Sequence, residues 1–254
     1  MENSNALVTH CVFDGNTADV SSPSLGAEGG GADCYAGGTP LFFNCLFINN
    51  WAKDFGGGIS MDSCDPVIIS CTFTANQCDI GAGVCGRSAD PVITNCIIWG
   101  NPIEEVFLTP GDPVINYTCI QRDTPWPGTG NINLDPLFVS GPLGPAYLSA
   151  VSTGQAVDSP CFDAGDLPAA DICDGNPLIC LDELTTMVDN TMDTGIADMG
   201  YHFPVSSAGS PTQSPTITPS PTITPSPTIT PSPSPTSSGN PTATPTETPS
   251  PSAT

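Results

Sequence analysis

Four aspartates lie close together in a loop-rich stretch of the chain: Asp163, Asp166, Asp171 and Asp174. Carboxylates at short spacing are ligands that hard cations prefer, so this group is a candidate calcium site. The spacing is not that of an EF-hand loop, because the alternating ligands and the distal Glu of that motif are missing. A set of solvated acidic loops is the alternative interpretation. Calcium is the only cofactor that the sequence suggests.

The chain also carries 12 cysteines, a density that fits a secreted or surface protein better than one in a reducing cytosol. Cys173 and Cys180 flank a short loop beside the aspartates, so a disulfide between them is a natural hypothesis. No tandem C-x2-C pattern is present, and His10 and His202 are the only histidines. A zinc site would therefore need to consist almost wholly of thiolates, and buried thiols with some disulfides are the preferred interpretation.

The charge balance excludes several partners. The chain has 26 acidic residues against three basic ones, Lys53, Arg87 and Arg122, which gives a formal net charge of −23. Nucleic acids and anionic membrane surfaces attract basic patches, so we expect neither as a partner. No apolar run approaches the ~18 residues that a membrane-spanning helix needs. We therefore predict no membrane span.

A repeat organises the first half of the chain. Four segments read Cys, then Phe or Ile two residues later, then Asn five residues after the Cys. Their cysteines are Cys11, Cys45, Cys71 and Cys96; the apolar positions are Phe13, Phe47, Phe73 and Ile98; the asparagines are Asn16, Asn50, Asn76 and Asn101. Prolines stand five residues before three of these cysteines, and glycine clusters such as Gly56-Gly57-Gly58 lie between the copies. A short repeat of this kind is typical of a solenoid.

The phase of the repeat predicts the shape of one coil. Counted from the Pro, the apolar positions fall at +2, +5 and +7, so the alternation of a strand breaks between +2 and +5. A residue at +4 must turn the chain there, and Asn44, Ser70 and Asn95 occupy that position. A third strand would follow the glycines through Ile59 or Val84. The sequence thus predicts an all-β fold, a parallel β-helix of about five coils.

Stacked coils place like residues above like. We expect the four cysteines to form one internal ladder and the Phe residues another, with the cysteines as small apolar filling rather than as a metal or redox column. Disulfides between neighbouring rungs are disfavoured, because in-register parallel strands hold β-carbons too far apart. We expect the repeat asparagines to end each strand by hydrogen-bonding backbone rather than by binding a ligand.

These residues resemble a known family. The pattern Pro-x-Ile-x-Asn-Cys-x-Phe-x-x-Asn with Gly-Gly-Gly-Ile is similar to the right-handed parallel β-helix repeats of bacterial surface and secreted proteins in the pectin-lyase-like superfamily. Phe47 to Asn50 and Phe73 to Asn76 also resemble the Phe-x-x-Asn mark of polymorphic outer-membrane-protein repeats. The resemblance covers roughly residues 5–139. It implies a fold more than a function, because one β-helix hosts lyases, hydrolases, adhesins and stalks.

Three parts follow from this pattern. Residues 1–139 are predicted to be the β-helix, 140–207 a C-terminal capping module, and 208–254 a Pro/Thr/Ser-rich linker or stalk, either O-glycosylated or unmodified. The composition favours an extracellular or bacterial cell-surface location, although the sequence from Met1 lacks a signal-peptide pattern. The first repeat begins without a cap, so we expect the chain to be a fragment of a larger secreted protein.

The residues favour a non-enzymatic role. Lyases of this fold abstract a proton with Arg or Lys, which are scarce here, and no catalytic residues are assigned. The preferred hypothesis is an adhesin-like or structural module with a surface glycan or protein as ligand and exposed aromatics such as Trp51 and Trp99. The alternative is a carbohydrate-active β-helix, a polysaccharide lyase or glycoside hydrolase, whose catalytic residues lie in missing coils. Asp54, Asp79 and Glu104 meeting in a groove would favour that alternative.

Overall fold

The computed structural model describes residues 1–19, 27–175 and 179–205. All of them belong to one compact unit, 1–220. The proposed linker at 208–254 lies outside the described residues. The described helices are three-residue 3-10 turns, and none is long and apolar enough to cross a membrane.

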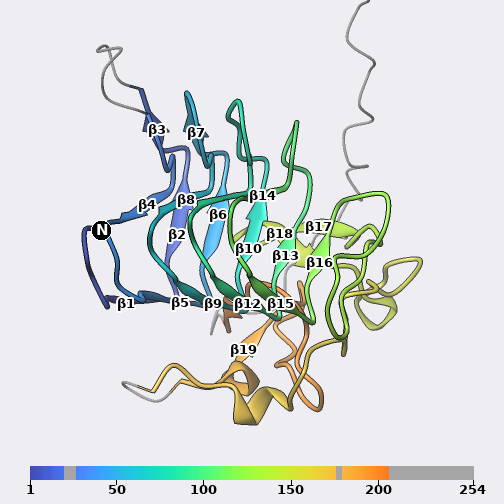
Figure 1. Ribbon diagram of the computed structural model, residues 1–254. Coiled ribbons are helices and arrows are strands. Elements are labelled where there is room, and N and C mark those ends of the chain that lie inside the picture. The colour runs from blue at the N-terminus through green and yellow to red at the C-terminus, as the bar shows by residue number, and fades with distance from the viewer. Residues whose placement is uncertain (20–26, 176–178, 206–254) are drawn as a thin grey trace, which may run out of the picture. The chain divides into compact units, whose positions relative to one another are not determined.

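Residues 7–120 form a parallel β-helix of three sheets that share one axis (Figure 1). The first sheet contains β1 (Leu7–Thr9), β5 (Leu41–Phe43), β9 (Val67–Ile69), β12 (Val92–Thr94) and β15 (Val114–Asn116). The second contains β2 (Val12–Asp14), β6 (Leu46–Ile48), β10 (Thr72–Thr74), β13 (Ile97–Ile98) and β16 (Cys119–Ile120). The third contains β4 (Ala32–Tyr35), β8 (Ile59–Asp62), β11 (Val84–Arg87) and β14 (Val106–Leu108). A short pair, β3 (Thr17–Ala18) with β7 (Trp51–Ala52), projects beside them.

The predicted solenoid is confirmed, with a small difference in the number of coils. Two sheets have five described strands, but the third has four. A fifth, less regular copy of the repeat, which begins at Pro113 and ends in Cys119, supplies β15 and β16 without a described partner strand in the third sheet. Its coil is therefore incomplete, and the count of about five was slightly too high.

One residue turns the chain between the first and second sheets of every coil. The turn residues have left-handed backbones, with φ of 53° at His10, 48° at Asn44, 52° at Ser70, 54° at Asn95 and 45° at Tyr117. This is the change of parity that the repeat predicted. Asn visits this conformation at low cost, because its short polar side chain bonds locally. The turn directs the middle residues of the first sheet, and the Cys and Phe positions that follow it, into the same interior.

The interior consists of stacked like residues. Phe47 lies between Phe13 and Phe73 with ring centroids 4.5 and 4.6 Å away and nearly parallel planes. The cysteines form the second ladder, in which the backbone N–H groups of Cys45 and Cys71 donate to the thiol of the next rung at 3.3 and 3.4 Å. These four cysteines are free thiols. They line the core, and Cys71 and Cys96 also accept backbone hydrogen bonds.

The repeat asparagines form a continuous hydrogen-bonded ladder. Oδ1 of Asn76 accepts from both the backbone N–H and Nδ2 of Asn50, at 3.0 and 2.9 Å. The same pair of bonds joins Asn16 to Asn50 and Asn76 to Asn101. Nδ2 of Asn76 also donates to the carbonyl of Phe47, so the expected bonding to backbone is present.

Glu105 ends this ladder. Its two carboxylate oxygens accept from the backbone N–H and from Nδ2 of Asn101. Burial raises the pKa of Glu105 to about 7, although the bonds from Asn101 and Gly100 oppose the shift. A buried carboxyl group thus replaces the next Asn at the point where the repeat degenerates.

The glycine clusters are needed for packing beside the ladder. A Cβ on Gly58 would lie 2.4 Å from the carbonyl oxygen of Gly83 and 2.8 Å from the ring of Phe73. No larger residue fits there without moving backbone. The glycines therefore let successive coils approach each other next to the stacked Phe and Asn side chains.

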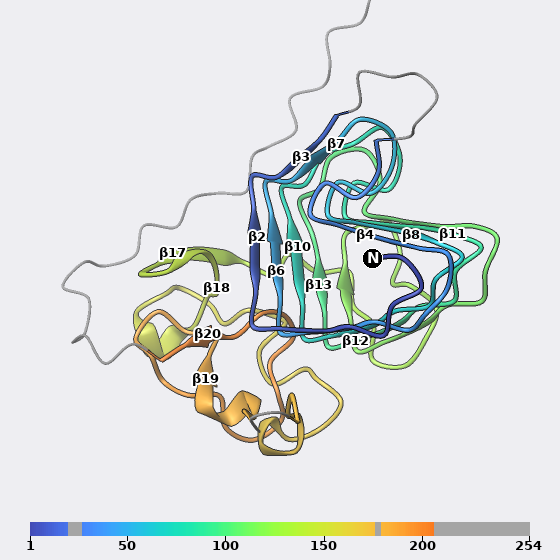
Figure 2. The same cartoon turned by 90° about the vertical axis from the view of Figure 1, so that its left-hand side faces the viewer.

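The C-terminal module packs on the outside of the corner where the first and second sheets meet (Figure 2). It contains two antiparallel pairs and three short turns: β17 (Phe138–Gly141), β18 (Gly144–Leu148), β19 (Leu184–Thr185), β20 (Phe203–Pro204), η1 (Val151–Thr153), η2 (Ala169–Asp171) and η3 (Leu181–Glu183). Phe43 packs with Leu181 and Ala169, and Leu46 lies in one cluster with Phe203.

The module predicted at 140–207 makes apolar contacts with outward side chains of the coils. This module covers the side of the coils, because the outward positions of β5 and β6 are themselves apolar. Trp126, which belongs to the predicted β-helix segment, packs against the solenoid core instead. The core thus continues beyond β16 through residues that carry no repeat signal.

The Asn ladder should be a major source of stability. Asn76→Ala leaves two donors of Asn50 without an acceptor, and each unsatisfied buried group costs about 1–3 kcal/mol. We expect the free energy of unfolding in urea to fall by roughly 3 kcal/mol. Gln77→Ala, at the exposed next position, is the control and should change it by less than about 0.5 kcal/mol. Equal effects of the two variants would contradict the ladder's role.

Glu105 should make stability depend on pH. Its pKa is raised in the folded state from 4.5 to about 7, so its stabilising effect is complete below about pH 4.5 and is lost as the pH rises through 7. Between pH 4.5 and 8, we expect the wild type to lose up to about 3 kcal/mol more unfolding free energy than Glu105→Gln. Urea titrations of both proteins at each pH measure this. Parallel pH profiles would refute the assignment.

Candidate functional site

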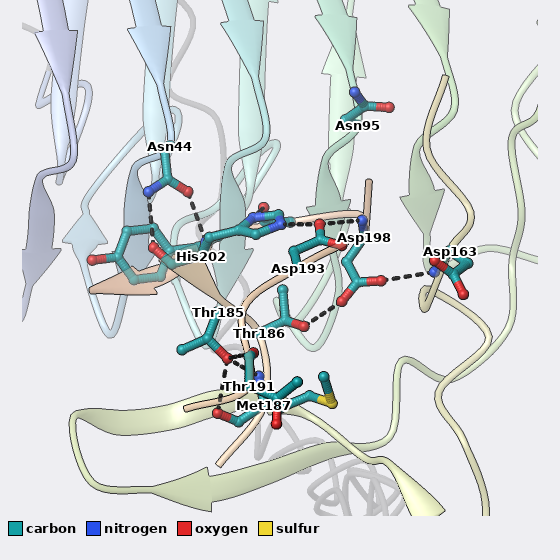
Figure 3. A network of polar contacts seen from close by, with 12 residues as sticks. Asn44, Asn95, Asp163, Thr185, Thr186, Met187, Thr191, Asp193, Asp198 and His202 are labelled. Atoms are coloured by element: carbon teal, nitrogen blue, oxygen red, sulfur yellow. Dashed lines mark hydrogen bonds and ion pairs between the residues drawn. The ribbon is translucent and has the colours of Figure 1, made fainter. Parts of the chain in front are cut away.

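The strongest polar site lies where the turn residues of the coils meet the C-terminal module. The left-handed turn holds the side chain of Asn44 outward, toward the strand that ends the module (Figure 3). Asn44 Oδ1 accepts from the backbone N–H of His202 at 2.7 Å, and its Nδ2 donates to the carbonyl of His202 at 2.8 Å. The Asn side chain thus pairs with a backbone segment as another strand would.

The turn side chains of other coils also contact the C-terminal module. Asn95 Nδ2 donates to Asp166 Oδ1 at 2.7 Å, and Asn95 Oδ1 accepts from the backbone N–H of Asp166 at 3.0 Å. His10 Nε2 lies 3.3 Å from Asp174 Oδ2. Asn44 Nδ2 also lies 3.0 Å from His10 Nδ1. Three turns of the solenoid therefore contact three different loops of the module.

A buried His–Asp pair lies behind Asn44. His202 Nε2 is 2.8 Å from Asp193 Oδ2, and both residues are almost fully buried. The other ring nitrogen, Nδ1, lies 3.0 Å from the carbonyl oxygen of Gly200. Both ring nitrogens lie within hydrogen-bonding distance of an oxygen, so the ring bridges two segments of the module. The pair is thus suited to hold the module together.

Three carboxylates meet next to this pair. One oxygen each from Asp163, Asp193 and Asp198 lies within 4.8 Å of the others. Asp198 accepts hydrogen bonds from Thr186 and from the backbone N–H of Asp163. Burial, then repulsion from Asp193, raises the pKa of Asp198 to about 6, and His202 opposes the shift. Asp163 is exposed, and its pKa is raised by the same two causes.

The four aspartates predicted as calcium ligands do not come together. Asp166 binds Asn95, Asp174 accepts from the backbone N–H of Ile179, and Asp171 is exposed on η2. Of the four, only Asp163 belongs to the cluster of three carboxylates; Asp198 was noted beside them in the sequence, and Asp193 was missed. The prediction relied on nearness in sequence, whereas these loops reach toward different coils.

The disulfide singled out in the sequence is present in the structure. Cys173 and Cys180 are joined, and the two residues also form an antiparallel bridge. This bond closes the loop that carries Asp174. The ten remaining cysteines are free thiols, nine of them buried.

A second polar cluster lies on the outer face of the third sheet. Arg87 Nη2 contacts Asp62 Oδ2 at 2.9 Å and also pairs with Glu28, while its guanidinium lies 4.4 Å from the ring centre of Phe55. Burial, then repulsion from Glu28, raises the pKa of Asp33 beside it. Asp33 Oδ1 and Arg87 Nε are buried and have no hydrogen-bond partner among the described residues.

The sequence contained a signal for this cluster. Tyr35, Asp62 and Arg87 each follow their glycine cluster at the same distance, and the register stacks them across β4, β8 and β11. Alignment on the glycines rather than on the cysteines would have found the ion pair between Arg87 and Asp62.

The acidic groups named as a test for a catalytic groove do not form one set. The bridge between Phe55 and Ile80 places Asp54 and Asp79 on neighbouring coils. Glu104 instead lies beside Ala82, because the backbone N–H of Ala82 donates to the carbonyl of Glu104. Asp54 binds the backbone N–H of Ala27, and Asp79 and Glu104 are exposed.

The two tryptophans named as exposed differ from each other. Trp51 is 36% exposed on β7, whereas Trp99 is partly buried against the cluster of Ile97 and Cys161. Of these two tryptophans, Trp51 alone is an exposed aromatic residue.

Comparisons with known proteins agree with this fold. Residues 1–119 match the family model of the right-handed β-helix region, which ends within the incomplete fifth coil. No curated protein and no solved structure gives a significant match. The matched segment is a right-handed parallel β-helix, as the resemblance in the sequence implied.

The His–Asp pair should hold the module in place. Asp193→Ala removes the acceptor of His202 Nε2 and of the backbone N–H of Asp198. Each buried group left without its hydrogen-bond partner costs about 1–3 kcal/mol. We expect hydrogen exchange to speed up across residues 184–205 more than across β5–β13. Asp171→Ala, which removes an exposed carboxylate, is the control, and equal exchange in both variants would contradict the proposed role.

Proposed function

We propose that this chain is a non-enzymatic β-helix module of an extracellular or cell-surface protein, with an adhesive or structural role. The observation that carries the proposal is that the buried polar groups where the coils meet the module are hydrogen-bonded to one another. Asn44 binds the backbone of His202 and so joins the coils to the module, and Asp193 binds the ring of His202. Groups already satisfied by one another are poorly placed to act on a substrate.

The interior supports the same conclusion. Stacked Phe, Cys and Asn side chains fill it, and the Asn side chains bond to backbone and to one another. A solenoid of this kind offers a long, regular outer surface. Such surfaces suit contact with an extended ligand, a glycan or a protein.

The proposed location outside the cell is supported by covalent structure and charge. A disulfide between Cys173 and Cys180 persists in oxidising compartments and is rare in a reducing cytosol. The net charge of −23 favours solubility and opposes self-association.

One observation favours a carbohydrate-active protein as a second candidate. At the third sheet, Arg87 pairs with Glu28 and Asp62, and nearby one oxygen of Asp33 is buried without a partner among the described residues. Carboxyl groups with raised pKa are the acids and bases of glycoside hydrolysis. Arg87 is already neutralised by Glu28 and Asp62, which leaves it less suited to abstract a proton.

A polysaccharide panel tests both candidates. Purified protein is incubated with polygalacturonate, alginate, xylan and β-glucan, and new reducing ends and the ultraviolet absorbance of unsaturated products are measured. We expect no release above a blank without protein. Release that Asp33→Asn or Glu28→Gln abolishes, while Asp79→Asn leaves it intact, would establish the second candidate and refute the first.

A further inference from the structure

Two rows of outward side chains run side by side along the solenoid. The first, here the Asp row, consists of Asp65, Asp90 and Asp112. The second, the aliphatic row, consists of Leu7, Leu41, Val67, Val92 and Val114, which are stacked in register at the start of β1, β5, β9, β12 and β15.

The alternation of each coil places the rows next to each other. Asp65 and Val67 lie on either side of the buried Pro66, so both point outward, and the same holds around Pro91. Backbone bonds from Val92 to Pro66 and from Val114 to Pro91 keep successive coils in register. Neighbouring coils lie about 4.8 Å apart, so each row is a regular array at that spacing.

The Asp row holds unneutralised charge in fixed positions. Oδ1 of Asp65 accepts a hydrogen bond from the backbone N–H of Asp90 at 2.7 Å. Oδ1 of Asp90 accepts one from the backbone N–H of Asp112. All three residues are exposed. None of the four ion pairs found in the described chain involves them. The carboxylates of Asp65 and Asp90 are thus held in place, each with its second oxygen left without a partner among the described residues.

The aliphatic row stays open beside it. Leu7, Val92 and Val114 are 48%, 39% and 51% exposed. The next outward position of the coil is different, because Phe43 and Ile69 there pack against the C-terminal module. Leu41 touches the edge of that module. The module therefore borders the row and leaves most of it uncovered.

We propose that these two rows form a docking surface for a basic amphipathic α-helix of another protein. The helix lies along the solenoid axis with its apolar side chains on the aliphatic row and its Lys or Arg side chains over the Asp row. The charges of the two surfaces are complementary. A helix places side chains of one face about 5–6 Å apart, close to the coil spacing, whereas alternate residues of an extended strand are nearly 7 Å apart. A helix of about four turns would match the described rows.

This inference rests on the proposed function, since it assigns a class of protein partner to an adhesive or structural module. The two can fail separately, because the polysaccharide panel examines catalysis and the following experiment examines docking alone.

The probe is a fluorescein-labelled helical peptide of about four turns with Leu on one stripe and Lys on the adjacent stripe. Its binding to the full chain is measured by fluorescence anisotropy. Asp65→Asn/Asp90→Asn/Asp112→Asn removes three charges but keeps the oxygens that accept the backbone N–H groups. Val67→Thr/Val92→Thr/Val114→Thr keeps β-branched residues and removes apolar surface. The control with matched charge is Asp79→Asn/Glu104→Gln/Asp123→Asn, all at exposed positions.

We expect each of the first two triple variants to raise the Kd at least tenfold and the control to change it less than twofold. All variants should show the same circular dichroism spectrum. An equal loss in the control would show diffuse attraction to an acidic protein and overturn the proposal. A chain that sediments as a dimer, becomes a monomer in the Val-to-Thr variant and does not bind the peptide would assign the surface to a second copy instead, and would also overturn it.

Discussion

The single-residue left-handed turn between the first and second sheets is the constraint on which the other features depend. It changes the parity of the chain within each coil, so that Phe42 before the turn and Cys45 and Phe47 after it all point inward. It also points the turn side chain outward. Where that side chain is Asn, its amide pairs with a backbone segment of the C-terminal module. One backbone conformation thus determines both the core ladders and the place where the module binds.

Parallel stacking then forces each polar group to be satisfied by its copy in the next coil. The Asn ladder meets this demand, because an amide is both donor and acceptor and can repeat without limit. Its end needs a group that only accepts, and Glu105 supplies two oxygens there. Burial of that carboxyl group is the cost, which its raised pKa expresses.

Most periodic features could be predicted from the sequence, whereas among the non-periodic ones only the disulfide between Cys173 and Cys180 could. The repeat in Cys, Phe and Asn specified the coil, the turn residues and the ladders, because stacking converts sequence spacing into contact. Asp193, Asp198 and His202 belong to the module, which has no repeat. Their meeting depends on how its loops pack against the coils. The aspartates predicted as a calcium site failed for the same reason, whereas Cys173 and Cys180 are close in sequence and needed no such packing.

The stacking of like residues also explains why acidic side chains repel one another on one face of the solenoid and are neutralised on another. Like charges about 5 Å apart in water repel by somewhat less than 1 kcal/mol, so the Asp row works against the fold. Asp65 and Asp90 each accept a hydrogen bond from a backbone N–H of the next coil. A charge-assisted bond of that kind stabilises by about 1.5–3 kcal/mol. The row is therefore stable as part of the coil while its repulsion remains. A cationic partner relieves that repulsion, whereas Arg87 already does so for Asp62 and Glu28 on the third sheet. The faces of the solenoid thus differ, because the third sheet contains its own cation, whereas the Asp row has none in an ion pair among the described residues.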